Sequence, residues 1–371
     1  MAMTNFSELG LQEKIVWARD LWAQARNLSF VMNFSGKGSN AMIQRITELT
    51  KSEKGAKAII TLVADLEGDG VMGDSTLENN EEAIKAFDTE IKIDQLRNAN
   101  RLRGRMADQK SVINFRNTSK DVLAYWLADR IDQLGFLTLS GVGYDYTTNG
   151  TLRPVNPAGQ NFTDLDFASD VTAPTANRYY RWDSTVGTTG ALVTAATNAV
   201  IAADLPSYEM LVQAKAVAKE KYIRGIKGPN GVEYYHVFMT PSGMAKLKLD
   251  SSYRSAVENA GQRGDSNPLF TGAVATVDGL IIHEYRHVFS STTWGASSNV
   301  SGQAVLFCGA QALGLADLGL PEWKEETFDY GNQHGIAMGK ICGFKKPKFT
   351  SIYEATATAE DFGVLRIDTA I

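Results

Sequence analysis

The sequence predicts a mixed α+β fold, and three observations support that prediction. Residues 118–138 have the apolar spacing of a long amphipathic helix. Two segments rich in β-branched and aliphatic residues, on either side of a long polar stretch, predict a hairpin between residues 57 and 93. Several short strands follow in the C-terminal third, and no internal repeat or low-complexity tract interrupts this order.

The composition is that of a folded protein with a substantial core. The chain has 371 residues, of which 44% are hydrophobic and 21% are charged, and its formal charge is −5 at pH 7. A net acidic chain is a poor candidate for a dedicated DNA-wrapping protein, although a local basic patch is not excluded. The two cysteines, Cys308 and Cys342, are too few for a disulfide framework. We therefore expect a soluble protein of two or three domains, made in a cytoplasm, without a signal peptide or membrane span.

The N-terminal region is predicted to contain an amphipathic helix at residues 8–28. Its apolar residues recur at spacings of three and four and then widen into a broad face: Leu11, Ile15, Ala18, Trp22 and Ala25, with Trp17, Leu21 and Leu28. Such a face contacts more than one neighbour. Two interpretations stay open, a helix packed on its own domain and an arm that lies on another subunit.

The predicted hairpin has strands at residues 57–64 and 87–93. The second strand alternates apolar and polar side chains, as a half-buried strand does. About twenty residues rich in Gly, Asp, Asn and Glu separate the two strands, from Asp65 to Ala86. A connection of this length is unusual within a compact domain and indicates either a function or disorder.

The long helix at residues 118–138 is predicted to begin at a capping box formed by Thr118 and Asp121. Its length corresponds to roughly 30 Å. One face carries its large apolar residues, Leu123, Trp126, Leu127, Ile131, Leu134 and Leu137. The acidic residues Asp121, Asp129 and Asp132 are expected to lie away from that face.

The remaining chain alternates irregular and regular segments. Residues 141–203 are rich in Thr, Gly, Asn and Pro, which predicts loops with short strands. One helix is expected near Pro206, with the proline at an early helical position, and another after the cap Thr240-Pro241. Strands are expected at residues 234–239, 279–288, 305–307, 344–349 and 362–367.

The motif His283-Glu284-Tyr285-Arg286-His287 matches the H-E-x-x-H pattern of zinc proteases. That chemistry needs a helix, where the two histidines lie one turn apart and share one metal ion. Here Gly279 and two isoleucines precede the motif and favour a strand, which would separate the histidines by roughly 13 Å. A zinc hydrolase is therefore the weaker hypothesis, and we expect no metal, cofactor or enzymatic activity.

Two further segments imitate ligand-binding loops. Residues 65–70 resemble the start of a calcium-binding EF-hand loop, but Thr76 stands where a bidentate Glu is required. Residues 35–39 (SGKGS) have the composition of a phosphate-binding loop, but neither the upstream glycine nor a leading strand is present. We interpret the first as an acidic turn and reject nucleotide binding for the second.

A dense basic cluster is formed by Arg97, Arg101, Arg103, Arg105 and Lys110, offset by an aspartate at 108. Three interpretations stay open: a solvated face, a contact with a neighbouring subunit, and a contact with nucleic-acid phosphates.

Eight blocks, spread in order over nearly the whole chain, resemble a known family. They are residues 34–44 (FSGKGSNAMIQ), 68–82 (GDGVMGDSTLENNEE), 93–97 (IDQLR), 263–272 (RGDSNPLFTG), 279–284 (GLIIHE), 309–312 (GAQA), 326–331 (ETFDYG) and 343–346 (GFKK). Each block alone is weak, and jointly they are specific. The chain resembles the major capsid proteins of tailed bacteriophages with the Hong Kong 97 fold, in the subgroup named after coliphage N-four. Residues 141–203 match least.

The resemblance implies an α+β capsid fold in five parts. These are an N-terminal arm at residues 1–56, an extended E-loop hairpin at 57–95, a peripheral domain at 96–202 with the spine helix at 118–138, an axial domain at 203–327, and a return to the peripheral domain at 328–371.

The resemblance also implies a function without catalysis. Members self-assemble into the hexamers and pentamers of an icosahedral head that encloses double-stranded DNA, in the cytoplasm of the bacterial host. Expected partners are further copies of the chain, a separate scaffolding protein, a portal, a decoration protein, and packaged DNA through non-specific contacts, with no membrane. The alternative is another self-assembling subunit, either encapsulin-like or a tail protein. The candidate intersubunit contacts are Trp17, Trp22, Met72, Leu77, Glu78, Glu81, Glu82, Arg97, Arg101, Arg103 and Arg105.

Overall fold

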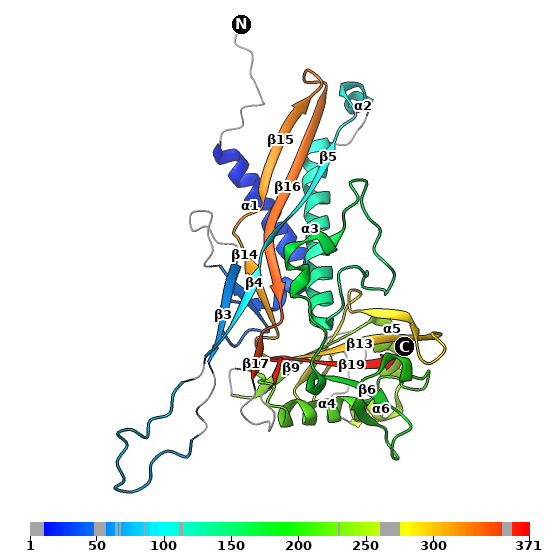
Figure 1. Cartoon of the computed structure of the whole chain (residues 1–371). Coiled ribbons are helices and arrows are strands. Elements are labelled where there is room, and N and C mark those ends of the chain that lie inside the picture. Colours follow the sequence, from blue (N-terminus) through cyan, green and yellow to red (C-terminus); the bar gives the residue numbers. More distant parts are fainter. Residues whose placement is uncertain are drawn as a thin grey trace.

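The protein is elongated, and its regular elements gather at two ends (Figure 1). The computed structural model describes residues 11–47, 57–63, 66, 68–84, 86–110, 114–228, 231–259, 275–350 and 358–371. A long strand ribbon with two helices forms one end, a second sheet with its own helices forms the other, and a loop projects from the side. Among the described residues, no helix is long and apolar enough to cross a membrane.

The first sheet has six strands and is organised by β16, which pairs antiparallel with three of the others. Toward the far end of the molecule, β16 lies between β5 and β15 as a three-stranded ribbon. At its other end it pairs with β14, which β2 and then β1 extend in parallel. The strands are β1 (Ser35–Gly36), β2 (Ile43–Ile46), β5 (Asp94–Arg101), β14 (Leu313–Asp317), β15 (Glu322–Phe328) and β16 (Gln333–Lys345).

Two helices, α1 (Leu11–Leu28) and α3 (Phe115–Ser140), pack side by side against this sheet. Helix α3 is longer than predicted and begins earlier. Its N-cap is Asn114, whose side chain accepts from the backbone N–H of Asn117, so the predicted capping box of Thr118 and Asp121 is wrong. The predicted apolar face is buried as expected at Leu123, Leu127, Ile131, Leu134 and Leu137. The short helix α2 (Arg105–Lys110) precedes α3 at the end of the ribbon.

Asp132 does not point away from the core, as the sequence suggested, but is 1% exposed. Its carboxyl group accepts hydrogen bonds from the Ser29 hydroxyl at 2.6 Å and from the backbone N–H groups of Phe30 and Val31 at 3.0 Å. The hydroxyl of Tyr285 also donates to it. Burial, followed by the effect of the Asp132 carboxyl group, raises the pKa of Tyr285, which therefore remains the donor. Asp132 thus joins α3 to the segment after α1 and to the second sheet.

The second sheet has nine strands. Its main path runs β10-β11-β9-β13-β19-β6-β7, while β12 pairs with β13 and β8 with β9. The strands are β6 (Tyr179–Asp183), β7 (Ala191–Thr194), β8 (Ile226–Lys227), β9 (Glu233–Met239), β10 (Ala275–Val277), β11 (Leu280–Glu284), β12 (Ser290–Trp294), β13 (Val300–Cys308) and β19 (Val364–Ala370). Their apolar residues form a core with three helices, α4 (Tyr208–Glu220), α5 (Pro241–Leu249) and α6 (Ser251–Asn259).

The first residues of these helices show where the local sequence is enough to predict a helix start. Thr240 caps α5 with Pro241 at the first helical position, which confirms the prediction. Helix α4 is capped by the Ser207 side chain, so Pro206 lies just before the helix and not within it. Residues 141–203 contribute β6 and β7 together with single-turn helices. The 3₁₀ helices of the chain are η1 (Val31–Phe34), η2 (Phe162–Asp164), η3 (Asp166–Asp170), η4 (Ala176–Arg178) and η5 (Thr197–Ala199).

The two sheets do not follow the predicted sequence boundaries. Strands β14 and β15 lie in the first sheet, although residues 203–327 were expected to form a single axial part. Strand β19 lies in the middle of the second sheet, although residues 328–371 were expected to return to the peripheral part. The chain crosses between the sheets more than once, because strand pairing joins segments far apart in the sequence.

Buried ion pairs connect the C-terminal segment to its surroundings. Lys346 contacts Asp361 at 2.9 Å, with both side chains 1% exposed. Arg366 contacts Asp368 at 2.8 Å, and Arg178 contacts Glu360 at 3.4 Å. Burial lowers the pKa of Lys346, which the carboxylate beside it opposes. Close by, β17 (Lys348–Thr350) and β18 (Ala359–Asp361) form a separate two-stranded sheet.

Replacing Asp132 by Ala should destabilise the free subunit strongly. The change leaves several buried donors without an acceptor, and each costs roughly 1–3 kcal/mol, so the free energy of unfolding should fall by about 3 kcal/mol or more. Urea unfolding followed by circular dichroism measures the change. The matched control is Asp121→Ala on the same helix, an exposed position that should change stability by about 0.5 kcal/mol or less. Equal effects for the two variants would contradict the role assigned to Asp132.

Candidate assembly surfaces

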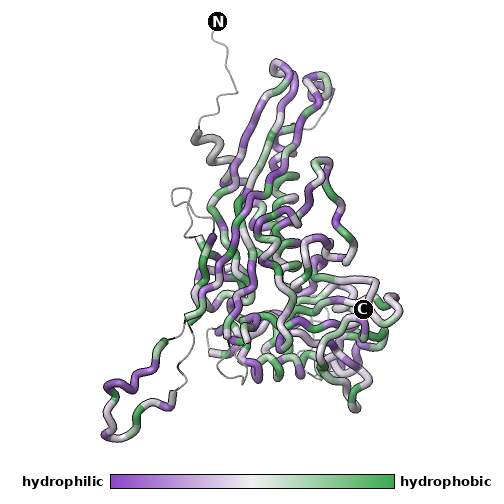
Figure 2. The backbone as a smooth tube through the Cα atoms, viewed as in Figure 1, coloured by the Kyte–Doolittle hydropathy of each residue, from purple (hydrophilic) through white to green (hydrophobic). Residues whose placement is uncertain are grey.

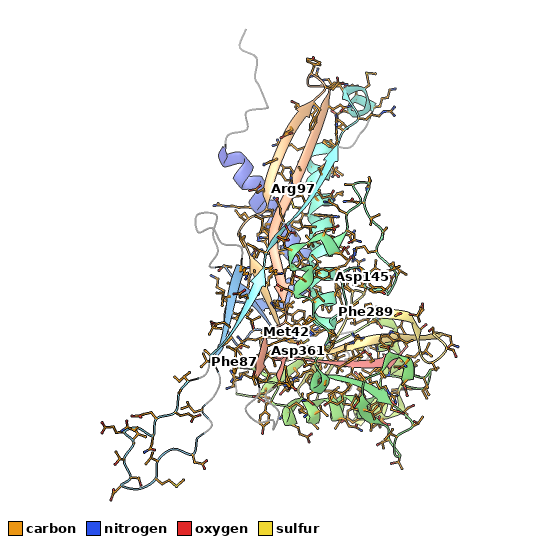
Figure 3. All side chains as sticks on the ribbon, in the orientation of Figure 1. Met42, Phe87, Arg97, Asp145, Phe289 and Asp361 are labelled. Atoms are coloured by element: carbon orange, nitrogen blue, oxygen red, sulfur yellow. The ribbon has the colours of Figure 1, made fainter. Side chains whose placement is uncertain are left out.

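A two-stranded hairpin carries the projecting loop. Strands β3 (Lys57–Val63) and β4 (Ala86–Lys92) pair antiparallel over seven residues. Of the predicted segment 65–86, residues 65, 67 and 85 lie outside the described residues. Beyond the hairpin, Met72 is 73% and Leu77 is 61% exposed, and Glu78, Glu81 and Glu82 are exposed as well. Figure 2 shows long hydrophilic stretches in this loop, and in Figure 3 its side chains lie apart from the rest of the molecule.

The base of the hairpin is seated on the first sheet. Ala58, Ile60, Leu62 and Ile91 point inward and are buried, whereas alternate residues of β3 are exposed. Two glycines of the sheet permit this close approach. A Cβ at Gly343 would lie 2.0 Å from the backbone oxygen of Lys92, and one at Gly314 would lie 2.4 Å from the Cδ1 atom of Ile60. The hairpin therefore has a fixed base and a free tip.

The ribbon presents the predicted basic residues on its outer face. Arg97 and Arg101 are exposed on β5, and Figure 3 labels Arg97 along the ribbon. They pair with Gly339 and Gly335 of β16, which have no side chains, and those glycines pair with Glu322 and Glu326 of β15. The face therefore has arginines on one edge strand and glutamates on the other. Arg103 and Arg105 are exposed at the end of the ribbon, where α2 begins.

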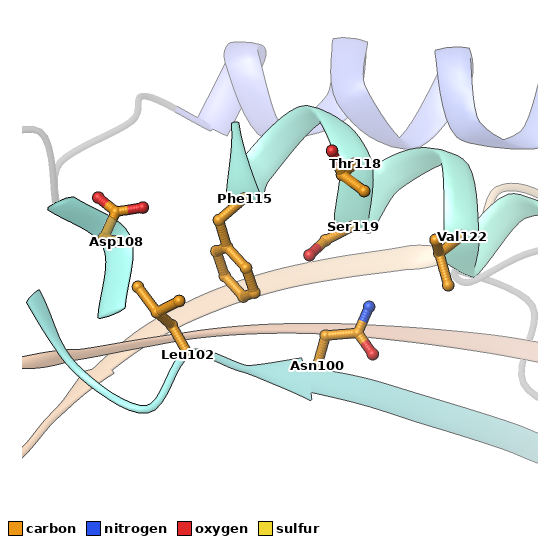
Figure 4. A pocket seen from close by; sticks show the side chains of 7 residues that line it. All are labelled: Asn100, Leu102, Asp108, Phe115, Thr118, Ser119 and Val122. Atoms are coloured by element: carbon orange, nitrogen blue, oxygen red, sulfur yellow. The ribbon is translucent and has the colours of Figure 1, made fainter. Parts of the chain in front are cut away.

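A groove of about 200 Å³ opens between β5, α2 and α3 (Figure 4). Its apolar lining comes from Leu102, Phe115 and Val122, and Val122 is 51% exposed. Polar side chains complete the lining: Asn100, Asp108, Thr118 and Ser119. The groove is lined by Asn100 of β5, whose side chain points to the opposite face of that strand from Arg97 and Arg101.

The N-terminal helix is integrated into its own subunit. Leu21, Trp22 and Ala25 are buried in the core shared with α3. Trp22 is 5% exposed, and the ammonium group of Lys340 lies 4.2 Å from the centre of its ring. Trp22 is therefore not an exposed contact residue, because its own chain already covers it. The side chain of Trp17 lies outside the described residues.

The two histidines of the H-E-x-x-H motif have different partners. His283 lies on β11, where its Nε2 is 2.9 Å from the Nδ1 of His236 on β9. His287 lies beyond the strand and donates from Nε2 to Asp129 at 2.8 Å. The motif is thus not helical, and this confirms the prediction from the sequence. Within the described part of the chain, no group of three or more His, Cys, Asp or Glu residues is arranged to hold a metal ion.

The phosphate-loop-like and calcium-loop-like segments also lack the structure that those ligand sites require. Residues 35–36 form strand β1 and lead into β2, whereas a phosphate-binding loop would open a helix. In the calcium-like segment, Asp65 and Glu67 lie outside the described residues. The exposed features that the structure does present are a projecting arm, a charged ribbon face and an apolar groove, which are surfaces for contact.

The His236–His283 pair is covered by aromatic rings. The ring of Phe34 lies 5.0 Å from that of His236 and 4.9 Å from that of His283, and Phe238 stacks on His283 at 5.2 Å. Burial lowers the pKa of His236 to about 4. Burial and then the neighbouring His236 lower the pKa of His283 to about 4. The contact has room for one shared proton, so the two rings cannot both be protonated while it persists.

Comparisons with known proteins identify the family of the chain. A family model described as phage capsid protein matches residues 5–371. The major capsid protein of Pseudomonas phage KPP25 is 57% identical over 371 residues, covering 98% of this chain and 96% of that protein. The solved capsid of Ralstonia phage GP4 matches with a TM-score of 0.72 and 27% identity, over 92% of this chain and 90% of that one. The capsid of cyanophage Pam1 shares the fold, with a TM-score of 0.67, 18% identity, and coverage of 100% and 94%.

The chain belongs to the phage capsid protein family. It is a major capsid protein, a structural component of a virion shell that assembles with further copies of itself. The prediction of a shell subunit is therefore confirmed, as is the prediction that the chain is not an enzyme.

Sequence reasoning missed the residues that attach the segment after α1 and the hairpin to the core. Asp132 was assigned to the solvent side, although it lies next to Ile131 and one turn after Ala128, both buried. That position on the helix was the available signal. Nothing local marks Gly314 or Gly343 as a seat, because the hairpin that covers them is more than 200 residues away in the sequence.

The histidine pair predicts a loss of stability in acid. Both pKa values are lower in the folded state than their ordinary value of 6.5, so the unfolded chain binds more protons between pH 6.5 and about 4. Stability should be complete above pH 6.5 and fall progressively toward pH 4, by on the order of 3 kcal/mol for one histidine and by less than twice that for the coupled, partly exposed pair. The double variant His236→Gln, His283→Gln should show a flatter dependence. Unfolding free energies measured across this range test it, and identical slopes in both proteins would contradict it.

Proposed function

We propose that the chain is a Hong Kong 97-type capsid subunit that forms the hexamers and pentamers of an icosahedral head around double-stranded DNA. The observation that carries this proposal is the projecting arm. Its base is fixed on the first sheet, while Met72 and Leu77 are exposed at a distance from their own core. A two-stranded hairpin alone is marginally stable in water, so such an arm gains from lying on a neighbour.

The arrangement of elements supports a division into the named parts of that fold. In this proposal the hairpin at residues 57–95 is the E-loop, α3 is the spine helix of the peripheral domain, and the second sheet with α4, α5 and α6 is the axial domain. The N-terminal segment would act as an arm only through residues before the buried part of α1. The motif blocks support membership of the coliphage N-four-like subgroup.

The charged surfaces support a contact between subunits. The acidic residues Glu78, Glu81 and Glu82 on the loop and the arginines Arg97, Arg101, Arg103 and Arg105 at the ribbon carry opposite charges at distant parts of one chain. A head-to-tail contact between copies brings two different surfaces together, and rotational symmetry closes such contacts into a ring. Many modest contacts then stabilise the assembly together.

Further partners follow from the same proposal. The resemblance to tailed-phage capsid proteins supports a separate scaffolding protein, a portal, a decoration protein and non-specific contacts with packaged DNA. It also supports assembly in the cytoplasm of a bacterial host.

Replacing residues 68–80 with a short Gly-Ser turn should abolish closed particles while leaving a folded, soluble subunit. The deletion removes Met72 and Leu77, which contribute on the order of 1.5–3 kcal/mol each if fully buried on a neighbour. Electron microscopy scores the particles, and circular dichroism scores the fold. As a control, residues 186–189, an exposed loop between β6 and β7, are replaced by a Gly-Ser sequence of equal length. Normal particles from the first variant would show that the loop is not an assembly arm.

Charge reversal at Arg97 and Arg101 should raise the protein concentration needed for assembly by about tenfold or more, because like charges facing each other across an interface cost several kcal/mol. The free subunit should melt normally, since both side chains are exposed. Light scattering against concentration measures assembly, with the double variant Lys246→Glu, Arg254→Glu at two exposed positions of α5 and α6 as the control for net charge. Intact assembly combined with impaired DNA retention would assign these residues to DNA instead.

A further inference from the structure

Arg153 is a partly buried arginine without an ion pair among the described residues. It lies on the loop between α3 and β6, and its side chain contacts Gln133 of α3. Its guanidinium carbon lies 4.3 Å from the centre of the Phe162 ring, and Nη2 donates to Gln133 Oε1 at 3.0 Å and to the Tyr146 carbonyl at 3.4 Å. Its Nε is buried without an acceptor. These acceptors are neutral, so no carboxylate among the described residues contacts the guanidinium group, although buried charges in proteins are ordinarily paired.

The charges around Arg153 increase this imbalance. Burial, followed by the guanidinium of Arg130, lowers the pKa of Arg153, and the carboxylate of Asp129 opposes the shift only weakly. That carboxylate is already occupied by four donors, His287 Nε2 and Arg286 Nη2 at 2.8 Å, Gln133 Nε2 at 2.8 Å and Arg130 Nη1 at 3.2 Å. Three guanidinium groups therefore gather around one carboxylate that has no free oxygen lone pair to offer Arg153.

Exposed apolar side chains accompany the unpaired charge. Tyr146 is 38%, Leu152 is 71% and Val155 is 62% exposed, all on the loop that carries Arg153. Tyr146 and Leu152 face each other in a β-bridge, so the loop has a defined shape. Figure 3 labels Asp145, at the start of this loop, beside α3. An arginine with a tyrosine and aliphatic neighbours is the composition of a protein–protein contact.

We propose that Arg153, supported by Arg130 and Arg286, binds a carboxylate of a second copy of this chain in the assembled shell. The planar guanidinium group matches a carboxylate in two parallel hydrogen bonds, and it is partly desolvated before the partner arrives. The chain has carboxylates to offer, since its formal charge is −5 and the projecting loop exposes Asp69, Asp74, Glu78 and Glu81. The free subunit thus holds an unpaired charge that assembly neutralises.

Phosphate groups of nucleic acid are also anions, but the surroundings favour a protein partner. Contacts to a phosphate backbone come mainly from basic and polar side chains. Leu152 and Val155 would stay exposed beside a phosphate, whereas a protein surface would cover them. A second copy of the chain is therefore the expected partner of Arg153, and binding of nucleic acid is the alternative that the experiments distinguish.

The variant Arg153→Gln separates an assembly role from a role in folding. The free subunit should melt at the same or a higher temperature, because the change removes a partly buried charge that has no ion pair among the described residues and leaves a neutral polar side chain in its place. The concentration needed to form shells should rise about tenfold or more. Arg254→Gln on α6, an exposed position that loses the same charge, should leave both values unchanged. A lower melting temperature of the free Arg153→Gln subunit, or an unchanged assembly threshold, would overturn the proposal.

Chemical modification identifies the partner. Phenylglyoxal should modify Arg153 in the free wild-type subunit, as read by peptide mass spectrometry, and Arg153 should be protected at least tenfold in DNA-free shells. Arg178, which is 0% exposed, is the unreactive reference in every sample. Protection that appears only in DNA-filled particles would assign the site to phosphate and overturn the second-copy proposal. Equal reactivity in the free subunit and in both kinds of particle would remove the site altogether.

Discussion

The hydrogen bonds to the carboxyl group of Asp132 hold the parts of this subunit together. One buried side chain on α3 accepts from the segment that follows α1 and from Tyr285, which follows strand β11 of the second sheet. The aromatic ring of Phe30 then stacks on Tyr285 at 4.2 Å, so the polar contact is covered by apolar surface. The two ends of the molecule are thereby fixed relative to each other at one point. A shell protein needs this, because its contact surfaces must keep their mutual geometry.

The projecting hairpin is organised in the opposite way. Its base is held by apolar side chains that fit over glycines of the first sheet, and its tip exposes large apolar side chains to solvent. A rigid base sets the direction of the arm, and a free tip leaves its apolar surface for a neighbouring subunit. Stability within the subunit and binding between subunits are thus assigned to different halves of one hairpin.

Charge follows the same division. Inside the subunit, Lys340 and Lys346 are buried beside Asp317 and Asp361, so each lysine has a carboxylate. At the surface, the ribbon arginines are exposed, and Arg153 is partly buried without an ion pair to any residue that the structure describes. A buried charge with a partner keeps most of the free energy that desolvation removed. A partly desolvated charge without a partner instead favours the binding of an opposite charge from outside the subunit. The buried lysines are therefore compensated within the folded subunit, whereas the ribbon arginines and Arg153 leave charge available at its surfaces.

The sequence by itself determined the elements that depend on neighbours along the chain. The apolar period predicted most of α3, and the Thr240-Pro241 pair predicted the start of α5. The first hairpin strand was predicted by its β-branched and aliphatic content, and the second by its alternating side chains. The context of the H-E-x-x-H motif was enough to reject a helical zinc site. These signals are local, because the spacing of residues on a helix or strand follows from backbone geometry alone.

Only the tertiary structure decided that Asp132 is buried, that Trp22 is covered by its own chain and that β19 joins the second sheet. It also decided that Arg153 forms no ion pair within the described part of the chain. The glycine-containing strand β16 was predicted only at its last residues. It is a strand because it pairs with β5, β14 and β15, and its local composition does not indicate one. Each of these features depends on contacts between segments that are distant in the sequence. Burial and charge compensation are properties of the packed molecule, and no local pattern of residues contains them.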